Sequence, residues 1–385
     1  MSKNIIVLSD GTGQAFSAPG KGGGTNVYKL YRAIRGVSSA DQVAFYDPGL
    51  GSDPDDDGLS WTRWGYNVLS QATGLGISRN IKDCYEALVQ HYEPGDRIFL
   101  FGFSRGAYTV RSMAGALSLC GIPARDKTGG SVKTDAKSRA AAIEEAVEEV
   151  YKHYAASDDP VEIERARQER IRRGEAYRRD RGAVTAAPYF IGVWDTVRAL
   201  GIPGLNWMLR FSHAFHNADL GASVAHARQA LAIDETRDIF APVLWSEPAE
   251  LRASGRLKQL WLAGDHSDVG GGYAETGLSD LALGWMVDEA CKVPQGLIID
   301  QAAYAALGLH PDPLGVQHDP RRGLGLLWAK GVRRLSDWDR FAIDPVKARF
   351  LAASVPTEDG TSPYDPEGAR SNTQAQTWIA QRGGA

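Results

Sequence analysis

The chain has 385 residues, of which 43% are hydrophobic and 23% are charged, as is usual for a soluble globular protein. This length allows one large α/β domain with insertions or two smaller domains, and we predict a single domain spanning residues 1–385. The formal net charge of −4 argues against a general surface for polyanions. We therefore expect no nucleic-acid partner.

Cysteine spacing and hydropathy exclude several further classes. Cys84, Cys120 and Cys291 are far apart and form no C-x-x-C motif, so neither a disulfide framework nor a zinc site is predicted. No apolar run reaches the roughly 18 residues of a membrane span. The run Ile5–Leu8 is also too short for the core of a signal peptide. We expect no transmembrane segment and a cytoplasmic location by default, although export without a cleavable signal would leave no trace.

The first predicted strand, Ile5–Leu8, leads into the loop Ser9-Asp10-Gly11-Thr12-Gly13. A dinucleotide-binding fingerprint would need a third glycine where Phe16 stands. An aspartate-nucleophile phosphatase would usually have a second aspartate in place of Thr12. We favour a backbone role, in which the amides of Gly11 and Thr12 stabilise an oxyanion.

An amphipathic helix capped by Thr25 or Asn26 and a strand at Val43–Tyr46 follow. The next segment, Asp53–Asp57, copies the first half of a calcium-binding loop, but position 12 of that loop is Trp64 instead of a bidentate glutamate. A solvated acidic turn is the favoured interpretation, and its role stays open.

The most informative stretch joins a strand to a helix. Ile98–Phe101 is apolar at every position, as expected of a strand buried on both faces of a parallel sheet. Gly102-Phe103-Ser104-Arg105-Gly106 then matches the G-x-S-x-G motif, in which a strained turn raises a serine hydroxyl above the sheet edge. The alternative is a glycine-rich turn that contains a serine by chance. The helix that follows is predicted to end at Gly121.

Two inserted helical segments, 125–187 and 200–230, are predicted to form a cap or lid. The first holds a cluster of arginines between Arg165 and Arg181, diluted by acidic residues, which is typical of a solvated helix face. An anionic lipid or phosphate docking surface is the alternative. The second carries large apolar residues from Leu205 to Phe215, either as core or as the wall of an acyl-chain pocket.

Two more strands end in polar loops. Tyr189–Val193 is followed by Trp194-Asp195-Thr196, and Leu257–Ala263 by a glycine-rich loop that carries His266. Beyond Pro294 the signals weaken, and we expect the last residues, 366–385, to fray.

Ser104, Asp195 and His266 occur in the chain order of α/β-hydrolases, each at the carboxyl end of a predicted strand. His266 would accept the serine proton during attack on an ester, and Asp195 would orient the imidazole and stabilise its charged form. The amide of Arg105, together with that of Gly11 or Thr12, would bind the oxyanion. The pattern predicts an α/β-hydrolase-like fold, with a mostly parallel central sheet, helices on both faces and inserted cap segments.

Three alternatives stay open at this point. Asp195 could be only a helix N-cap. Asp268 could compete with it as the acid, although it lies two residues from His266 on the same loop. His266 with Asp10, Asp265 and Asp268 could instead bind a metal, but the spacing matches no metal motif, so we predict neither metal nor cofactor. Asp10 and Asp268 are assigned supporting roles.

Four of these stretches, 9–13, 102–108, 192–197 and 266–273, also carry a resemblance. In this order they resemble the signatures of a bacterial and fungal family that includes the catalytic domain of type VI secretion phospholipase effectors of the Tle class. The similarity extends from residue 5 to about residue 290. It implies an α/β-hydrolase fold, the triad Ser104, Asp195 and His266, and lipid or phospholipid esters as substrates.

Our leading hypothesis is therefore a serine esterase of the lipase or phospholipase type that forms an acyl-enzyme. Its partners would be a lipid or ester substrate and, peripherally, a membrane surface. A non-catalytic lipid- or partner-binding module is the alternative, and a metal-dependent phosphoesterase is a weaker one. Acyl-chain length, head group, regiospecificity, oligomeric state and export as an effector do not follow from the sequence.

Overall fold

The computed structural model describes residues 2–11, 24–48, 74–154, 159–197, 219–322, 326, 328–333, 335 and 343–382, with positions 74–77 and 343 described by their backbone alone. Its centre is a six-stranded sheet in the order β2-β1-β3-β4-β5-β6, in which every neighbouring pair is parallel. The strands are β1 (Asn4–Ser9), β2 (Gln42–Asp47), β3 (Arg97–Phe103), β4 (Pro188–Trp194), β5 (His226–Ala232) and β6 (Leu257–Leu262). The predicted α/β-hydrolase-like fold is confirmed.

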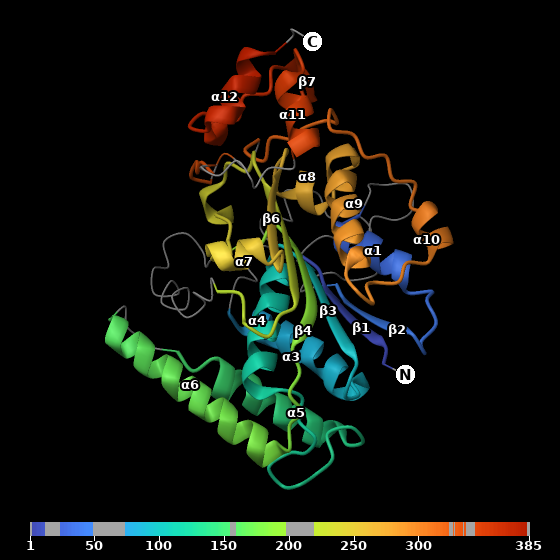
Figure 1. Ribbon diagram of the computed structural model, residues 1–385, viewed down its shortest axis with the longest axis vertical. Coiled ribbons are helices and arrows are strands. Elements are labelled where there is room, and N and C mark those ends of the chain that lie inside the picture. Colours follow the sequence, from blue (N-terminus) through green and yellow to red (C-terminus); the bar gives the residue numbers. More distant parts are fainter. Residues whose placement is uncertain are drawn as a thin grey trace.

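Helices cover both faces of this sheet (Figure 1), so that the inner strands β1, β3, β4 and β5 are buried from both sides. One face packs against α1 (Asn26–Ile34) and α9 (Gly277–Lys292), and the other against α3 (Gly74–His91) and α4 (Arg105–Cys120). Successive strand residues point to opposite faces. Accordingly, Phe99 and Phe101 belong to the core beside α1 and α9, whereas Leu100 belongs to the core beside α3 and α4.

The strand order changes direction between β1 and β3. The chain passes from β1 to β2 on one side and then to β3 on the other side of β1. In open parallel sheets the carboxyl ends of such a strand pair flank the crevice where ligands bind. Gly11 lies beyond the end of β1, and Ser104 follows β3 directly.

Strand β5 is not among the sequence-based predictions. Its sequence, His-Ala-Arg-Gln-Ala-Leu-Ala, lacks β-branched and aromatic residues, which are the usual signal for a strand. It is nevertheless buried, because it pairs with β4 on one side and β6 on the other. The lid predicted for 200–230 is therefore wrong for residues 226–230, which belong to the sheet. Residues 200–218 of that lid, with the apolar stripe, lie outside the described part of the chain, as do Thr12, Phe16 and the turn Asp53–Asp57.

The segment predicted as 125–187 forms α5 (Ala136–Glu144), the π-helix η1 (Glu145–Tyr151) and α6 (Pro160–Arg181). These helices lie on α3 and on the C-terminal half of α4. A Cβ on Gly115 would lie 2.7 Å from the Tyr151 ring, and one on Gly174 would lie 2.7 Å from the Leu119 carbonyl oxygen. The two glycines thus permit this close packing. A role of the segment as a cap over the site stays a prediction.

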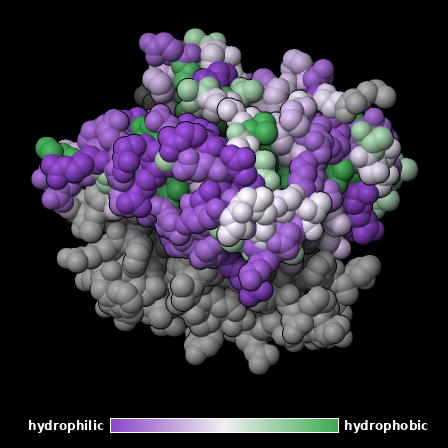
Figure 2. Space-filling model, turned by 90° about the horizontal axis from the view of Figure 1, so that it is seen from below, coloured by the Kyte–Doolittle hydropathy of each residue, from purple (hydrophilic) through white to green (hydrophobic). Residues whose placement is uncertain are grey.

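Helix α6 is charged along most of its length. Its arginines pair with acids three or four residues away, as in Arg167–Glu164 and Arg172–Glu169. Such exposed pairs contribute little to stability. The end of the molecule where α5 and α6 lie in Figure 1 faces the viewer in Figure 2, and its described residues are mostly hydrophilic there. Among the described helices, none is long and apolar enough to cross a membrane.

The C-terminal residues fold against the carboxyl ends of β5 and β6, so the predicted fraying from residue 366 is wrong as far as residue 382. Ala369, Ala375 and Trp378 are buried in a core cluster with Leu231 and Trp261. These buried apolar contacts hold the segment in place, and Asn372 caps its last helix. The elements are α11 (Ile343–Leu351), β7 (Val355–Thr357), β8 (Gly360–Ser362), η7 (Glu367–Ala369) and α12 (Thr373–Ala380).

The turn into α4 depends on a glycine at the crossing of two backbones. A Cβ on Gly106 would lie 1.9 Å from the carbonyl oxygen of Ser9, a distance that requires a backbone shift. We expect Gly106→Ala to lower the free energy of unfolding by about 3 kcal/mol, the upper range for overpacking.

Urea unfolding measures this change, with Gly284→Ala in α9 as the matched control. A Cβ on Gly284 meets no atom within 4 Å. This variant should gain about 1 kcal/mol, because alanine is the better helix former. Equal changes in the free energy of unfolding for the two variants would show that the contact with Ser9 does not destabilise Gly106→Ala.

Candidate active site

Ser104 occupies a strained turn between β3 and α4. Its backbone has φ 57° and ψ −119°, which places a non-glycine residue in a region that side chains seldom adopt. A Cβ on Gly102 would lie 2.6 Å from the Ala107 amide nitrogen, so this glycine also permits the reversal of the chain. The Ser104 amide donates to the carbonyl oxygen of Trp194, which ties the turn to the end of β4.

His266 and Asp195 form a buried pair at the same edge of the sheet. Asp195 follows β4, and His266 begins the short helix α8 (His266–Gly270) after β6. Nδ1 of His266 lies 2.6 Å from Oδ2 of Asp195, and neither residue is exposed to solvent. This contact places the imidazole proton on Nδ1, facing the carboxylate, and leaves Nε2 as the proton acceptor.

Two aromatic rings pack against the imidazole, and the buried ion pair of Glu235 and Arg237 lies nearby. The rings of Phe103 and Phe240 lie with their centres 4.6 Å and 4.9 Å from that of His266. Burial lowers the pKa of His266 below its usual value, and the hydrogen bond and charge of Asp195 offset this only in part. Nε2 is buried and has no hydrogen-bond partner among the described residues, Ser104 included. A buried acceptor without a partner is costly unless another molecule or a rearrangement supplies a donor.

The loop after β1 brings one predicted oxyanion donor close to Ser104. A Cβ on Gly11 would lie 3.3 Å from Cβ of Ser104. The Gly11 amide donates to the carboxylate of Asp10 over 2.7 Å, so in this structure it is already engaged. Arg105 is the first residue of α4, and an amide at this position has no partner within its helix. Thr12, the third predicted donor, lies outside the described residues.

The Asp10 side chain holds this loop through hydrogen bonds. Its second carboxylate oxygen accepts hydrogen bonds from the hydroxyls of Tyr46, at 2.8 Å, and Thr25. Burial raises the pKa of Asp10 to about 6, although these hydrogen bonds act in the opposite direction. The carboxylate therefore links the loop to β2 and to the start of α1.

Asp268, the competing candidate for the acid beside His266, contacts His318 instead. Its carboxylate accepts from the amide of Asp265 and lies 2.7 Å from Nδ1 of His318. His318 in turn stacks on Tyr273, with the two ring centres 3.6 Å apart. Asp268 thus holds the loop that carries His266, while Asp195 is the acid that contacts the imidazole.

The metal site considered as an alternative would need a group of ligands that the described part of the chain does not bring together. No group of three or more histidine, cysteine, aspartate or glutamate side chains there could hold a metal ion. Asp10, His266 and Asp268 each bond to a different partner, as described above.

Comparison with known proteins identifies the family of the chain. A family model described as the catalytic domain of "T6SS, Phospholipase effector Tle1-like" matches residues 3–289. The chain belongs to this Tle1-like family. An uncharacterised protein of Saccharomyces cerevisiae (strain ATCC 204508 / S288c), YEL023C, is 28% identical over 246 residues, which are 62% of this chain and 32% of the yeast protein.

Solved structures resemble the Tle1-like chain more distantly. An uncharacterised protein from Pseudomonas aeruginosa is 16% identical with a TM-score of 0.43, covering 80% of this chain and 49% of its own. The Tle1 effector bound to the VgrG spike of the type 6 secretion system is 18% identical with a TM-score of 0.30, covering 72% and 52%. The Est2 esterase of Thermogutta terrifontis, bound to butyrate, is 10% identical with a TM-score of 0.36, covering 77% and 85%. The chain thus spans about a third of the yeast relative and about half of the first two structures.

Arg333, like His318, lies beyond the part of the chain that matches the Tle1-like family. The guanidinium of Arg333 donates to both carboxylate oxygens of Asp195, over 2.6 Å and 2.9 Å. The same nitrogens donate to the carbonyl oxygens of Ala232 and Phe240, so the side chain is held at four points. Burial would raise the pKa of Asp195, but the charge of Arg333 and the contact with His266 outweigh it and hold that pKa well below its usual range.

Sequence reasoning did not single out Arg333. It follows Asp195 by 138 residues and belongs to no recognisable motif. The only available signal was a general one, namely that a buried aspartate needs a cation or several donors.

Removing the Arg333 charge should destabilise the fold. We expect Arg333→Met to lower the free energy of unfolding by about 3 to 5 kcal/mol at pH 7, because it leaves Asp195 buried without its cation. Arg333→Lys keeps the charge but not the two-pronged geometry, so the loss should be smaller. Chemical denaturation measures both.

The pH dependence gives a second criterion. Since the pKa of Asp195 is lower in the folded than in the unfolded state, the stabilisation is present above about pH 4 and is lost as the pH falls further. The difference between wild type and Arg333→Met should therefore shrink in acid. Lys330 lies three residues before Arg333 and forms an exposed ion pair with Glu367. The free energy of unfolding of Lys330→Met should stay within about 0.5 kcal/mol of the wild-type value. A Met variant as stable as this control would contradict the assignment.

Proposed function

We propose that this Tle1-like chain is a serine hydrolase that cleaves carboxylic ester bonds of lipids or phospholipids. The observation that carries the proposal is the buried pair of Asp195 and His266, whose free Nε2 lies at the same sheet edge as the strained Ser104 turn. Membership of a family named for phospholipase effectors supports the substrate class.

The first half of the reaction follows from these groups. The oxygen of Ser104 attacks the carbonyl carbon of the ester while Nε2 of His266 takes its proton. The negative charge that develops on the carbonyl oxygen faces the amide of Arg105 at the start of α4. When the tetrahedral intermediate collapses, the bond to the alcohol breaks and the imidazolium returns the proton to the leaving oxygen. An acyl group then remains on Ser104.

Water completes the cycle by the same path. It attacks the acyl carbonyl, gives its proton to Nε2, and releases the carboxylic acid as Ser104 recovers its proton. Throughout, Asp195 keeps the imidazole tautomer fixed and stabilises its positive form. Arg333 holds the carboxylate so that it stays ionised.

A fluorophosphonate probe tests the nucleophile. It should label the folded wild-type chain at Ser104 and leave Ser104→Ala unlabelled, as read by intact mass and peptide mapping. Ser254→Ala is the matched control, since Ser254 is exposed just before the start of β6, at the opposite edge of the sheet, and its hydroxyl donates to the Leu251 carbonyl oxygen. This variant should be labelled like wild type.

A hydrolysis panel of short esters, triglycerides and phospholipids, with Ser104→Ala as the blank, then identifies the substrate class. If folded wild type is neither labelled nor faster than this blank on any ester, the chain is a binding module and not a hydrolase.

The rate should depend on pH through His266. The imidazole accepts a proton only when neutral, and its pKa lies below the usual 6.5. We therefore expect full ester hydrolysis at pH 7 and a loss as the pH falls through a midpoint below 6.5, measured as kcat/KM. Circular dichroism at each pH separates this loss from unfolding.

Asp10 titrates in the same range, with a pKa of about 6, and needs its own control. Burial raises the pKa of Asp234 to about 6 as well, so both titrations are removed in Asp10→Asn/Asp234→Asn, and an acidic limb that persists in this double variant belongs to His266. A midpoint above pH 7 in both proteins would contradict the assigned role of the imidazole.

A further inference from the structure

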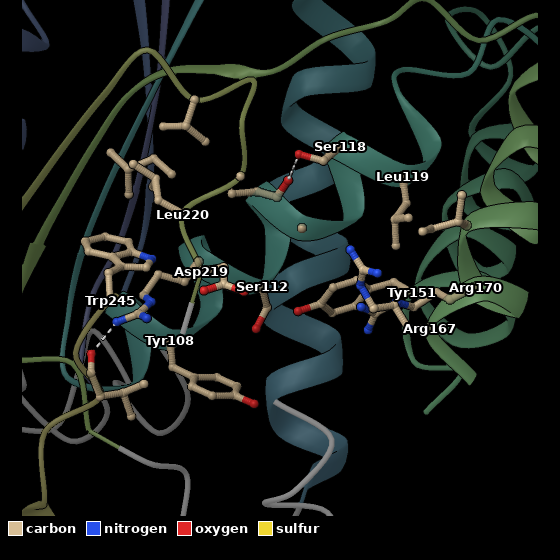
Figure 3. A pocket seen from close by; sticks show the side chains of 18 residues that line it. Tyr108, Ser112, Ser118, Leu119, Tyr151, Arg167, Arg170, Asp219, Leu220 and Trp245 are labelled. Atoms are coloured by element: carbon tan, nitrogen blue, oxygen red, sulfur yellow. Dashed lines mark hydrogen bonds between the residues drawn. The ribbon is translucent and has the colours of Figure 1, made fainter. Parts of the chain in front are cut away.

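A cavity of about 220 Å³ lies beside α4, and its lining is unusually rich in arginine (Figure 3). On α4 it is lined by Tyr108, Arg111, Ser112 and Gly115. With 3.6 residues per turn, positions 4, 7, 8 and 11 after Ser104 share one helix face. The cavity therefore runs along one face of α4, beginning one turn after Ser104.

Arg111 is the central charged group of this cavity. One of its terminal nitrogens donates to the Val243 carbonyl oxygen, and the guanidinium lies over the Trp245 ring, 4.1 Å from its centre. The other terminal nitrogen, Nη2, is buried and has no hydrogen-bond partner among the described residues. Burial lowers the pKa of Arg111 to about 9, so the side chain is still charged at pH 7.

Within the described part of the chain, the charge of Arg111 has no counter-ion. A guanidinium has five N–H donors, and a buried one without a counter-ion is costly. No carboxylate of the described residues lies within ion-pair distance of Arg111. Contact with the Trp245 ring compensates only part of the charge. An anion in the cavity would supply both the missing charge and the missing acceptor.

The remaining charged groups around the cavity strengthen this conclusion. Figure 3 shows Arg167 and Arg170 on the side opposite Trp245. Arg170 lies over the Tyr154 ring, 4.5 Å from its centre, and its Nε is also buried without a described partner. Asp219 is the only acidic residue among the described lining residues. Arg167 already pairs with Glu164, so Arg111 and Arg170 are the two lining arginines with a buried nitrogen that lacks a described partner.

Size and polarity narrow the ligand class. About 220 Å³ is below the volume of a typical site for a drug-sized ligand, so the cavity suits a small group better than a whole lipid. Several guanidinium groups match the multiple oxygens of a phosphate particularly well. We propose that the cavity is a phosphate-ester subsite, with Arg111 as its principal ligand. As part of the substrate path, which rests on the proposed function, it would hold the phosphate of a phospholipid head group while Ser104 attacks an ester bond.

Binding is tested without catalysis. Ser104→Ala, as the full chain, is titrated calorimetrically with inorganic phosphate, with glycerol 3-phosphate and with glycerol. We expect both phosphates to bind and glycerol not to bind. Adding Arg111→Gln should weaken phosphate binding at least tenfold.

Asp219→Asn provides a second variant on an exposed residue, in case the change at Arg111 disturbs folding. It removes a repelling charge and should tighten phosphate binding two- to fivefold. Absence of phosphate binding in the parent protein, or equal affinity in all three proteins, would overturn the proposal.

Kinetics then distinguish the source of the phosphate. For Arg111→Gln, the ratio of kcat/KM on phospholipid vesicles to that on a neutral short ester should fall at least tenfold relative to wild type. If phosphate binds through Arg111 but no ester is hydrolysed, the subsite stands for a soluble phosphate ester and the proposed function fails. If phospholipids are hydrolysed and the ratio is the same in both proteins, the proposed function stands and the head-group subsite is overturned.

Discussion

The carboxylate of Asp195 is a negative charge without exposure to solvent, and the candidate site is arranged around its compensation. A buried ion of this kind is tolerated only when several donors surround it. His266 contacts one oxygen, the Ala232 amide contacts the other, and Arg333 spans both. These partners come from three distant parts of the chain. The single charge therefore ties the end of β4 to β5, to the loop after β6 and to the C-terminal segment.

The sequence predicts the parts of the fold that local chemistry determines. Ile98–Phe101 is apolar throughout and forms the centre of β3. Gly102 and Gly106 are needed because a Cβ at either position would clash with neighbouring backbone atoms. β5 has no such signal, since its burial comes from two neighbouring strands and not from its own residues. The C-terminal helix α12 was missed for the same reason. Trp378 is one apolar residue in a polar stretch, and only the tertiary fold shows what covers it.

In the candidate site, too, some residues can be predicted from local sequence and others depend on the tertiary fold. Ser104 and His266 stand in motifs whose glycines mark sharp turns after strands, so both could be predicted from local sequence. The order of the motifs and the closeness of Asp268 to His266 in the chain favour Asp195 over Asp268 as the acid, and only the structure shows which carboxylate contacts the imidazole. Arg333 lies furthest from prediction. Its role exists only because the chain beyond the residues shared with the Tle1-like family returns to the sheet edge and meets Asp195.

The clamp on Asp195 also affects the neighbouring imidazole. A carboxylate that is shared with Arg333 attracts a proton on His266 less strongly than a free carboxylate would, because the two cations compete for the same negative charge. Burial against Phe103 and Phe240 acts in the same direction, and the pKa of His266 is lowered. For the proposed hydrolysis, the lowered pKa favours a neutral imidazole at pH 7 in a fixed orientation, with Nε2 able to accept a proton. The lowered pKa thus increases the fraction of His266 in the proton-accepting form and decreases its basicity, and general-base catalysis depends on the product of the two.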